Sequence, residues 1–327
     1  MSPASPSSFS DPQRFAKVTV VGAGNVGATT AQLLLTKNSA DVVLIDAAEG
    51  LAAGKALDLM HMRASEQFGP RVTGSSSYEA AQDSDIVVIT AGVARKPGMT
   101  REELINVNAG IVASVLTHAL AVAPQAVYIL VTNPLDVMTN LAARLTKLPD
   151  ERLMGMGGVL DSARFVHAIS LATGAQPADI NAMVIGAHGE AMVPLTSLAT
   201  VSGQPLASVL ERPKQQIAQI VEATVQGGAA VVELLKTSSA FYAPASAITR
   251  MVQAILNGED ALLPVCAHLR GQYGLDNLYM GVPARLGSGG ISHIVELPLS
   301  QDEHQLLTAA AKTILTQVHQ AAVAFKP

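Results

Sequence analysis

Cysteine is almost absent from this chain, whose 327 residues contain only Cys266. A single cysteine excludes an intrachain disulfide bond and a metal site built from several thiolates. Such a composition is typical of a reducing compartment, and we expect a cytoplasmic protein. Cys266 lies in an apolar, strand-like stretch, so we interpret it as a buried thiol.

The sequence also lacks a concentration of positive charge. It has 21 Lys and Arg residues against 26 Asp and Glu residues, and the formal net charge is -5. Nucleic-acid surfaces and polybasic membrane anchors need clustered basic side chains, and none of the runs in this chain provides them. We therefore expect no nucleic acid and no membrane as a partner, and we predict a small-molecule substrate.

Two segments could be mistaken for targeting or membrane sequences. Residues 1–16 are rich in Ser and Pro but have no apolar stretch and no repeated Arg, so we expect a flexible tail. The stretch Ile105–Leu135 has no charged residue and is long enough to cross a bilayer. Polar side chains interrupt it, however, and Pro124 divides it. We predict a buried helix followed by a buried strand over Ala126–Val131.

Short apolar runs rich in β-branched residues alternate with Ala- and Leu-rich helical stretches in the first half of the chain. Continuous apolarity indicates strands covered on both faces, as in a parallel sheet with crossover helices. The predicted strands are Val18–Val21, Val42–Ile45, Arg71–Thr73, Ile86–Thr90 and Ala126–Val131. We therefore predict an α/β fold with a Rossmann-type, doubly wound parallel sheet over residues 17–150.

Past about residue 150 the pattern changes to mixed α+β, so we predict a second domain over residues 151–327. We expect two strand-like runs on either side of Gly287–Gly290. The other predicted elements are helices over Ser162–Thr173, Gln215–Lys236, Ala245–Leu256 and Asp302–Ala324, and strands over Ala182–Ile185 and Leu195–Val201.

A glycine motif, G-A-G-N-V-G, directly follows the first predicted strand. Its first glycine permits a tight turn, the second lets the backbone approach a pyrophosphate, and the third allows close helix packing. Asp46 ends the second strand, where a carboxylate can bond the ribose hydroxyls and repel a 2′-phosphate. The combination predicts that the first domain binds NAD rather than NADP. The predicted contacts are Gly22, Ala23, Gly24, Asn25, Val26, Gly27 and Asp46.

Four further stretches occur in a characteristic order behind the glycine motif. They are A-R-K-P-G-M-T-R-E-E-L at 94–104, V-T-N-P-L-D at 131–136, D-S-A-R at 161–164 and G-A-H-G-E at 186–190. Together they resemble the lactate/malate dehydrogenase family, and most of all its NAD-dependent malate branch. The resemblance runs from about Lys17 to Ala324. It implies reversible oxidation of (S)-malate to oxaloacetate by hydride transfer, and a homodimer or homotetramer.

The resemblance also implies catalytic roles for individual residues. His188 matches the histidine that acts as the family's base. An imidazole suits that role because it titrates near neutral pH and can return the proton in the reverse reaction. Asp161 resembles its orienting partner. Arg164, three residues later on a helix, matches the arginine that grips the substrate carboxylate through two parallel hydrogen bonds. Arg101 resembles the arginine on a mobile loop that polarises the carbonyl group, and Pro97-Gly98 supports a hinged loop.

The remaining expected contacts come from the resemblance as well. Asn133 matches a contact of both substrate and cofactor, and Asn108 matches a cofactor contact, with Val131 and Thr132 also beside the cofactor. Arg95 is the expected partner of a second substrate carboxylate, and Lys96 is the alternative. No metal site is expected.

Three other functions compete with this interpretation. A lactate dehydrogenase would share His188, Asp161 and Arg164, but it usually carries an uncharged side chain at the position of Arg95. An NAD-dependent glycosidase would need a metal held by Cys and His, which the single Cys266 disfavours. A protein that senses NAD without catalysing a reaction would not require His188, Asp161, Arg164 and Arg101 together. The sequence departs from the family pattern at Glu190 and at His61 with Ser65-Glu66, none of which is among the predicted catalytic residues.

Overall fold

The computed structural model describes residues 15–94 and 98–324, without the side chains of Arg101 and residues 322–324. Its main sheet has eleven strands, six of which are parallel in the order β3-β2-β1-β4-β5-β6. These strands are β1 (Lys17–Val21), β2 (Asp41–Ile45), β3 (Val72–Ser75), β4 (Ile86–Ile89), β5 (Val127–Leu130) and β6 (Leu153–Gly155). The doubly wound parallel sheet predicted from the sequence is confirmed, and β6 is the strand that the sequence pattern missed.

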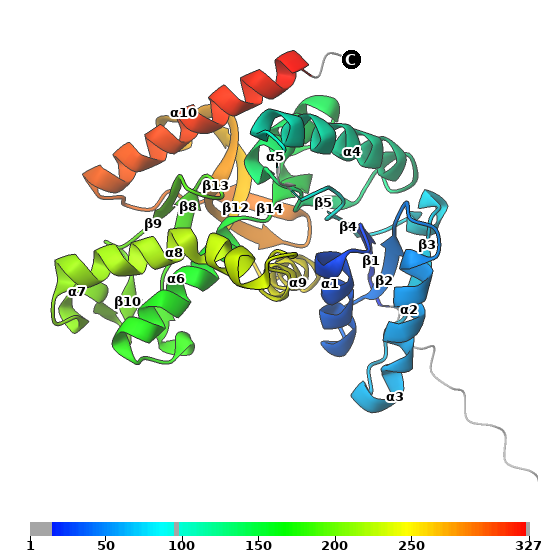
Figure 1. Ribbon diagram of the computed structural model, residues 1–327, viewed down its shortest axis with the longest axis horizontal. Helices are drawn as coiled ribbons and strands as arrows, with labels where there is room; N and C mark the ends of the chain where they lie inside the picture. Colours follow the sequence, from blue (N-terminus) through cyan, green and yellow to red (C-terminus); the bar gives the residue numbers. More distant parts are fainter. Residues whose placement is uncertain (1–14, 95–97, 325–327) are drawn as a thin grey trace, which may run out of the picture.

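The central parallel strands are buried on both faces, as their continuous apolarity predicts. All four residues of β4 are fully buried, and so are most residues of β1 and β5. Helices cover the two faces: α4 and α5 lie on one side with α10 beside them, and α1 lies on the other side against α9 (Figure 1). The helices of this half are α1 (Asn25–Thr36), α2 (Leu51–His61), α3 (Arg63–Glu66), α4 (Arg101–Val122) and α5 (Leu135–Leu145).

Helix α4 is long and apolar enough to span a membrane by composition alone. In the fold it is a core helix. Ile105, Val112, Leu116 and Ala119 are buried, and the helix packs against α5 and α10. The following strand β5 is buried throughout, which confirms the predicted buried helix and strand.

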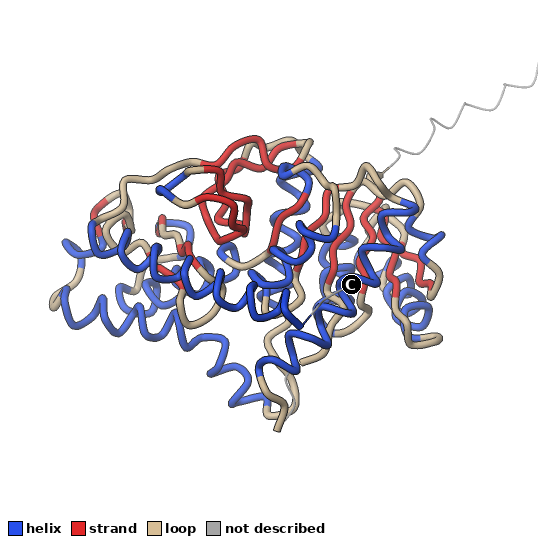
Figure 2. The backbone as a smooth tube through the Cα atoms, turned by 90° about the horizontal axis from the view of Figure 1, so that it is seen from above, coloured by secondary structure: helices blue, strands red, loops and turns tan. Residues whose placement is uncertain are grey.

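The second half extends the same sheet with antiparallel strands. Gly155 of β6 pairs with Cys266 of β12, and β13, β8 and β9 follow in order, with β14 also paired to β13. Figure 2 shows from above how the strands of both halves lie next to one another. The strands are β8 (Val184–Gly186), β9 (Met192–Pro194), β12 (Ala261–Arg270), β13 (Asp276–Gly287) and β14 (Gly290–Ile294), and a separate small sheet contains β7 (Ile180–Asn181), β10 (Thr200–Val201) and β11 (Gln204–Pro205).

Four helices of the second half match the predicted positions within a few residues: α6 (Gly158–Thr173), α8 (Pro213–Leu235), α9 (Tyr242–Leu256) and α10 (Gln301–Ala324). The short helix α7 (Leu206–Val209) was not predicted, and short 3₁₀ turns are η1 (Tyr78–Ala81), η2 (Asp150–Arg152), η3 (Pro177–Asp179) and η4 (Gln272–Gly274). Helix α6 begins four residues before its predicted start, because glycine is a poor helix former and hid the first turn. A Cβ on Gly158 would lie 2.7 Å from Pro264 Cβ, so close packing on β12 requires that glycine.

The predicted strand over Leu195–Val201 is wrong. The chain leaves β9 at Pro194, turns, and enters β10 only at Thr200. The turn is held by Glu303 of α10, whose carboxylate accepts hydrogen bonds from the Ser197 backbone N–H at 3.0 Å and the Ser197 hydroxyl at 2.6 Å. Apolar residues on both sides of the turn are buried, which is why their pattern resembled one continuous strand.

Candidate active site

His188 and Asp161 form a hydrogen-bonded pair at the carboxyl edge of the parallel sheet. His188 follows β8, and Asp161 lies in the first turn of α6, directly after β6. The ring Nδ1 lies 2.8 Å from Asp161 Oδ2. Because an ionised carboxylate can only accept, Nδ1 carries the hydrogen and Nε2 keeps its lone pair. The pair is therefore arranged to accept a proton at Nε2.

The surroundings of His188 favour the protonated ring. Burial lowers the pKa of His188, but the charge and hydrogen bond of Asp161 and the charge of Asp136 outweigh it, so that the pKa is raised from its usual value. The Arg164 charge opposes this in part. The side chain of Asp161 is only 2% exposed, whereas that of His188 is 17% exposed. The ring thus remains open to a ligand while its partner is enclosed.

Arg164 lies one helical turn after Asp161, on the same side of α6, as its spacing predicts. Its Nη1 donates to Asp161 Oδ1 at 3.2 Å. The guanidinium lies against α8, where two consecutive glycines leave room for it. A Cβ on Gly227 would lie 3.1 Å from Arg164 Cδ, and one on Gly228 would lie 3.4 Å from both Nη atoms. The glycine pair is a functional feature of α8 that the sequence analysis did not identify.

A second buried carboxylate, Asp136, lies behind the His188 loop. Its Oδ2 accepts the backbone N–H of His188 at 2.7 Å, and the residue is 5% exposed. Burial raises the pKa of Asp136 to about 6, although the charge and N–H of His188 lower it. Asp136 belongs to the V-T-N-P-L-D stretch, but no role was predicted for it. The signal that could have found it is its charge, since no other charged residue lies in the buried part of α5, residues 135–142.

The glycine motif forms the turn between β1 and α1, as predicted. Gly22 has φ of 102°, and a Cβ on Gly27 would lie 1.9 Å from the Gly22 carbonyl oxygen. Gly24 and Asn25 are exposed, Val26 is half-buried, and α1 begins at Asn25 without a side-chain cap. Backbone N–H groups at this helix end are thus available to an anion. The open side of Gly24 leaves space for a ligand, so the turn fits the pyrophosphate of a dinucleotide.

Asp46 lies beside this turn at the end of β2. Its Oδ2 accepts the Ala23 N–H at 2.7 Å, and its Oδ1 accepts the Ala48 N–H at 2.9 Å. The carboxylate is half-buried, so its negative charge is fixed next to the turn and still reachable by a ribose. The sequence predicted the position of this charge but not that it also holds the backbone of the turn.

Asn108 of α4 ties together the chain segments that follow β4 and β5. Its Nδ2 donates to the carbonyls of Asn133 at 2.7 Å and Val93 at 3.1 Å, and its Oδ1 accepts the Val93 N–H at 2.8 Å. The residue is 1% exposed. Nearby, Thr132 is buried and donates to the Ala91 carbonyl at 2.6 Å, Val131 is half-buried, and Asn133 is exposed at the carboxyl end of β5.

Only part of the predicted loop at residues 94–104 belongs to the described residues. Arg95 and Lys96 lie outside the described residues, as does Pro97. Arg101 is the first residue of α4, and its side chain lies outside the described part of the chain. The helix start is fixed by a capping box, in which Thr100 Oγ1 accepts the Glu103 N–H and Glu103 Oε2 accepts the Thr100 N–H. Glu190 is exposed beyond Gly189.

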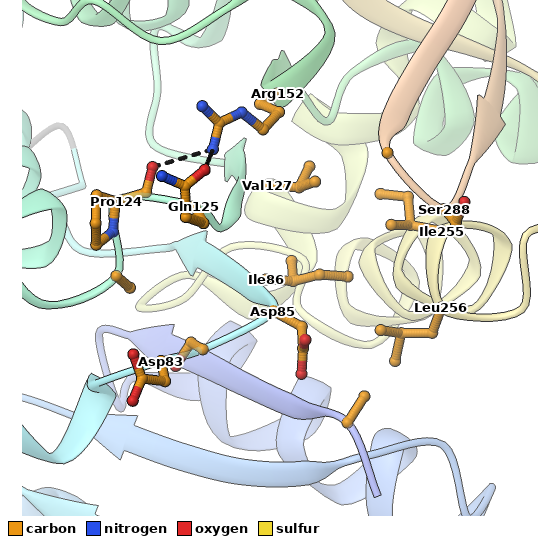
Figure 3. A pocket seen from close by; sticks show the side chains of 14 residues that line it. Asp83, Asp85, Ile86, Pro124, Gln125, Val127, Arg152, Ile255, Leu256 and Ser288 are labelled. Carbon is orange, nitrogen blue, oxygen red and sulfur yellow. Dashed lines mark hydrogen bonds between the residues drawn. The ribbon is translucent and has the colours of Figure 1, made fainter.

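The cavity drawn in Figure 3 is a different place. It encloses about 500 Å³ at the amino ends of the parallel strands, where Asp85 precedes β4 and Arg152 precedes β6. Arg152 donates to Gln125 Oε1 at 3.2 Å across one wall (Figure 3). Doubly wound sheets bind their ligands at the carboxyl ends of the strands, which is where His188 and the glycine turn lie. Over 15–94 and 98–324, no cluster of three or more His, Cys, Asp or Glu side chains could hold a metal ion.

Comparison with known proteins assigns both halves of the chain. Residues 16–155 match the family described as lactate/malate dehydrogenase, NAD binding domain, and residues 158–325 match its alpha/beta C-terminal domain. A malate dehydrogenase from Nostoc punctiforme is 49% identical over 93% of this chain and 92% of its own length.

Two solved structures from Cryptosporidium parvum are equally close in fold. Its malate dehydrogenase has a TM-score of 0.91 and 43% identity, covering 94% of this chain and 99% of the other. Its lactate dehydrogenase, complexed with lactic acid and nicotinamide adenine dinucleotide, has a TM-score of 0.91 and 37% identity. That match covers 96% of this chain and 99% of the lactate dehydrogenase. The fold alone therefore does not separate the two substrates.

Proposed function

The chain belongs to the lactate/malate dehydrogenase family, and from that premise we propose that it is an NAD-dependent malate dehydrogenase. The observation that carries the mechanism is the cluster of His188, Asp161 and Arg164 at the carboxyl edge of the sheet. High identity to malate dehydrogenases over most of the chain supports malate and oxaloacetate as the substrate pair.

His188 is the proposed general base for malate oxidation. Its Nε2 takes the hydroxyl proton, and in oxaloacetate reduction it returns that proton. The bound nicotinamide supplies the hydride acceptor or donor. Asp161 holds the Nδ1–H tautomer at 2.8 Å and stabilises the imidazolium that forms. The same contact orients the ring, so that the proton moves to and from one fixed position.

Besides Arg95, three residues are proposed to bind the substrate. Arg164 grips the C1 carboxylate through its planar guanidinium, and its contact with Asp161 holds the guanidinium beside the base. Arg101 polarises the carbonyl oxygen from the start of α4. Asn133, exposed at the end of β5, is the third proposed contact.

The proposed NAD site combines the glycine turn, Asp46 and the segment after β5. The N-terminus of α1 faces the pyrophosphate, and Asp46 accepts hydrogen bonds from the ribose while disfavouring a 2′-phosphate. Val131 and Thr132 flank the nicotinamide side. We propose that Asn108 serves this site by fixing the backbones of Val93 and Asn133, because its own polar atoms are occupied by those bonds.

We propose a cytoplasmic homodimer or homotetramer with domains over 17–150 and 151–327. The two family matches meet between residues 155 and 158, which supports a division near residue 150. Apolar side chains are exposed around the end of α8 and the start of α9, where Leu234 is 82% and Tyr242 72% exposed, and Leu57 of α2 is 60% exposed. Such surface supports self-association. The single cysteine is buried, which suits a reducing compartment.

Steady-state turnover of NADH with oxaloacetate and pyruvate in parallel tests the substrate assignment. A second carboxylate needs a cation near it, and one such pair about 4 Å apart contributes on the order of 4 kcal/mol at an effective dielectric near 20, before desolvation is subtracted. We therefore expect Arg95→Gln to lower kcat/KM for oxaloacetate at least about tenfold and to raise the relative use of pyruvate.

Lys96→Gln is the matched control, and we expect a much smaller effect from it. A larger loss from Lys96→Gln than from Arg95→Gln would move the specificity role to Lys96. A wild-type enzyme that prefers pyruvate would overturn the malate assignment while leaving the dehydrogenase mechanism intact.

A further inference from the structure

Asp136 is a buried acidic residue that has no role in the mechanism above. It lies in the first turn of α5, a helix whose residues 135–142 are all buried. One carboxylate oxygen, Oδ2, accepts the backbone N–H of His188 at 2.7 Å. The other, Oδ1, is buried and has no hydrogen-bond partner among the residues that the structure describes. A buried carboxylate costs free energy unless hydrogen bonds or a neighbouring positive charge compensate it.

The groups around Asp136 come from three elements. The His188 loop faces it after β8, Asp161 and Arg164 belong to the same cluster on α6, and the Cys266 thiol faces it from β12. The Cys266 thiol is a weak hydrogen-bond donor to the Asp136 side chain, and it lowers the pKa of Asp136 only in part. Burial and the Asp136 charge raise the pKa of Cys266, which keeps the thiol neutral. The imidazole of His188 is thus the group in this pocket that gains a positive charge during malate oxidation.

We propose that Asp136 is a positioning residue for His188, which acts through two separate contributions. Its Oδ2 holds the backbone of the loop that carries the base, and its negative charge stabilises the imidazolium formed when His188 accepts the proton of malate. The proposal rests on the proposed function of His188. Asp161 contacts the ring itself, whereas Asp136 acts from behind the loop, so the base has two carboxylates with different tasks.

The direction of the expected pH effect follows from the charge. Asp136 favours the protonated form of His188 and raises its pKa. Removing the charge should therefore lower the pKa of His188. Malate oxidation needs unprotonated His188 and oxaloacetate reduction needs the protonated ring. In each direction, kcat/KM falls on one side of the pH at which His188 titrates. We call these two pH values the pH limits of His188, and both should move to lower pH together.

Asp136→Asn separates charge from position, because the amide oxygen can still accept the His188 N–H. The measurement is kcat/KM against pH in both directions, together with NADH affinity. We expect the shift described above, an increased KM for oxaloacetate above neutral pH, and an NADH Kd within about twofold of wild type. An unshifted pH limit in a folded variant would overturn the charge role. Asp136→Ala, which also removes the acceptor, should lower kcat further.

Glu303→Gln is the matched control. Glu303 is also a buried carboxylate, 4% exposed, that accepts backbone N–H groups, but its partners are Ser197 and Ser300 instead of the His188 loop. We expect this variant to lose stability without moving either pH limit. An equal shift in Glu303→Gln would show that neutralising any buried carboxylate has this effect, and it would overturn the proposal.

A nuclear magnetic resonance titration of ¹³C-labelled histidine gives a test that needs no turnover. His188 is identified among the eight histidines by comparison with His188→Asn. Its titration midpoint should lie at lower pH in Asp136→Asn than in the wild-type protein, because the Asp136 charge favours the imidazolium. Equal midpoints in the two folded proteins would overturn the proposal. Inactivity towards malate would instead overturn the proposed function, which this titration does not test.

Discussion

Single side chains in this protein serve the site through more than one contact. Asp46 is the clearest case. Its charge lies where a ribose is expected, but its two oxygens also accept the N–H groups of Ala23 and Ala48. A substitution there alters both the charge and the glycine turn, and the two effects need to be separated.

Asp46→Ser and Asp46→Asn together separate them. Both remove the charge that repels a 2′-phosphate, so both should narrow the preference for NAD over NADP. Asn keeps an oxygen acceptor for the Ala23 N–H, so we expect it to weaken NAD binding less than Ser does. The measurement is kcat/KM for each cofactor. An unchanged cofactor ratio in both variants would show that Asp46 does not face the ribose.

Helix α8 has to remain a stable helix and also to leave space for the side chain of Arg164. It is a long surface helix, yet it contains consecutive glycines, each of which costs a helix interior about 1 kcal/mol relative to alanine. The glycines lie against Arg164, and a Cβ on Gly227 would press on its side chain at 3.1 Å. The helix therefore gives up stability to leave space for the arginine.

Gly227→Ala should reverse that balance. We expect the free energy of unfolding to rise by about 0.5–1 kcal/mol, because alanine favours the helix. The displaced Arg164 should raise KM for oxaloacetate several-fold, with little change in NADH affinity. Gly110→Ala in α4 is the control, since nothing lies within 4 Å of its added Cβ. If Gly227→Ala and Gly110→Ala leave KM equally unchanged, the glycine pair has no role in positioning Arg164.

The same elements show what the sequence could and could not predict. The runs of apolar residues located β1, β2, β4 and β5, and the glycine motif located the turn between β1 and α1, because these features depend on local sequence. The turn after Pro194 depends on Glu303, more than one hundred residues away. Likewise the bond from His188 to Asp136 spans 52 residues, so no local pattern revealed it. Long-range polar contacts of this kind need the folded chain.

At the scale of the whole molecule, one sheet carries both halves of the site. Strand β6 ends the parallel set and pairs with β12 of the second half, so α6 begins at the junction. The glycine turn and Asp46 come from one half, and Asp161, Arg164 and His188 come from the other. This continuity holds the proposed cofactor site and the proposed proton-transfer site in a fixed relation, which hydride transfer between two bound molecules requires.

In the proposed mechanism, His188 exchanges the proton of the substrate while other residues bind the cofactor. His188→Asn tests it most directly, by comparing kcat for oxaloacetate reduction with the Kd of NADH measured by fluorescence. The glycine turn and Asp46 are untouched, so we expect NADH affinity to stay within about twofold of wild type while kcat falls by about two orders of magnitude or more. A variant that binds NADH and retains most of its turnover would contradict the account.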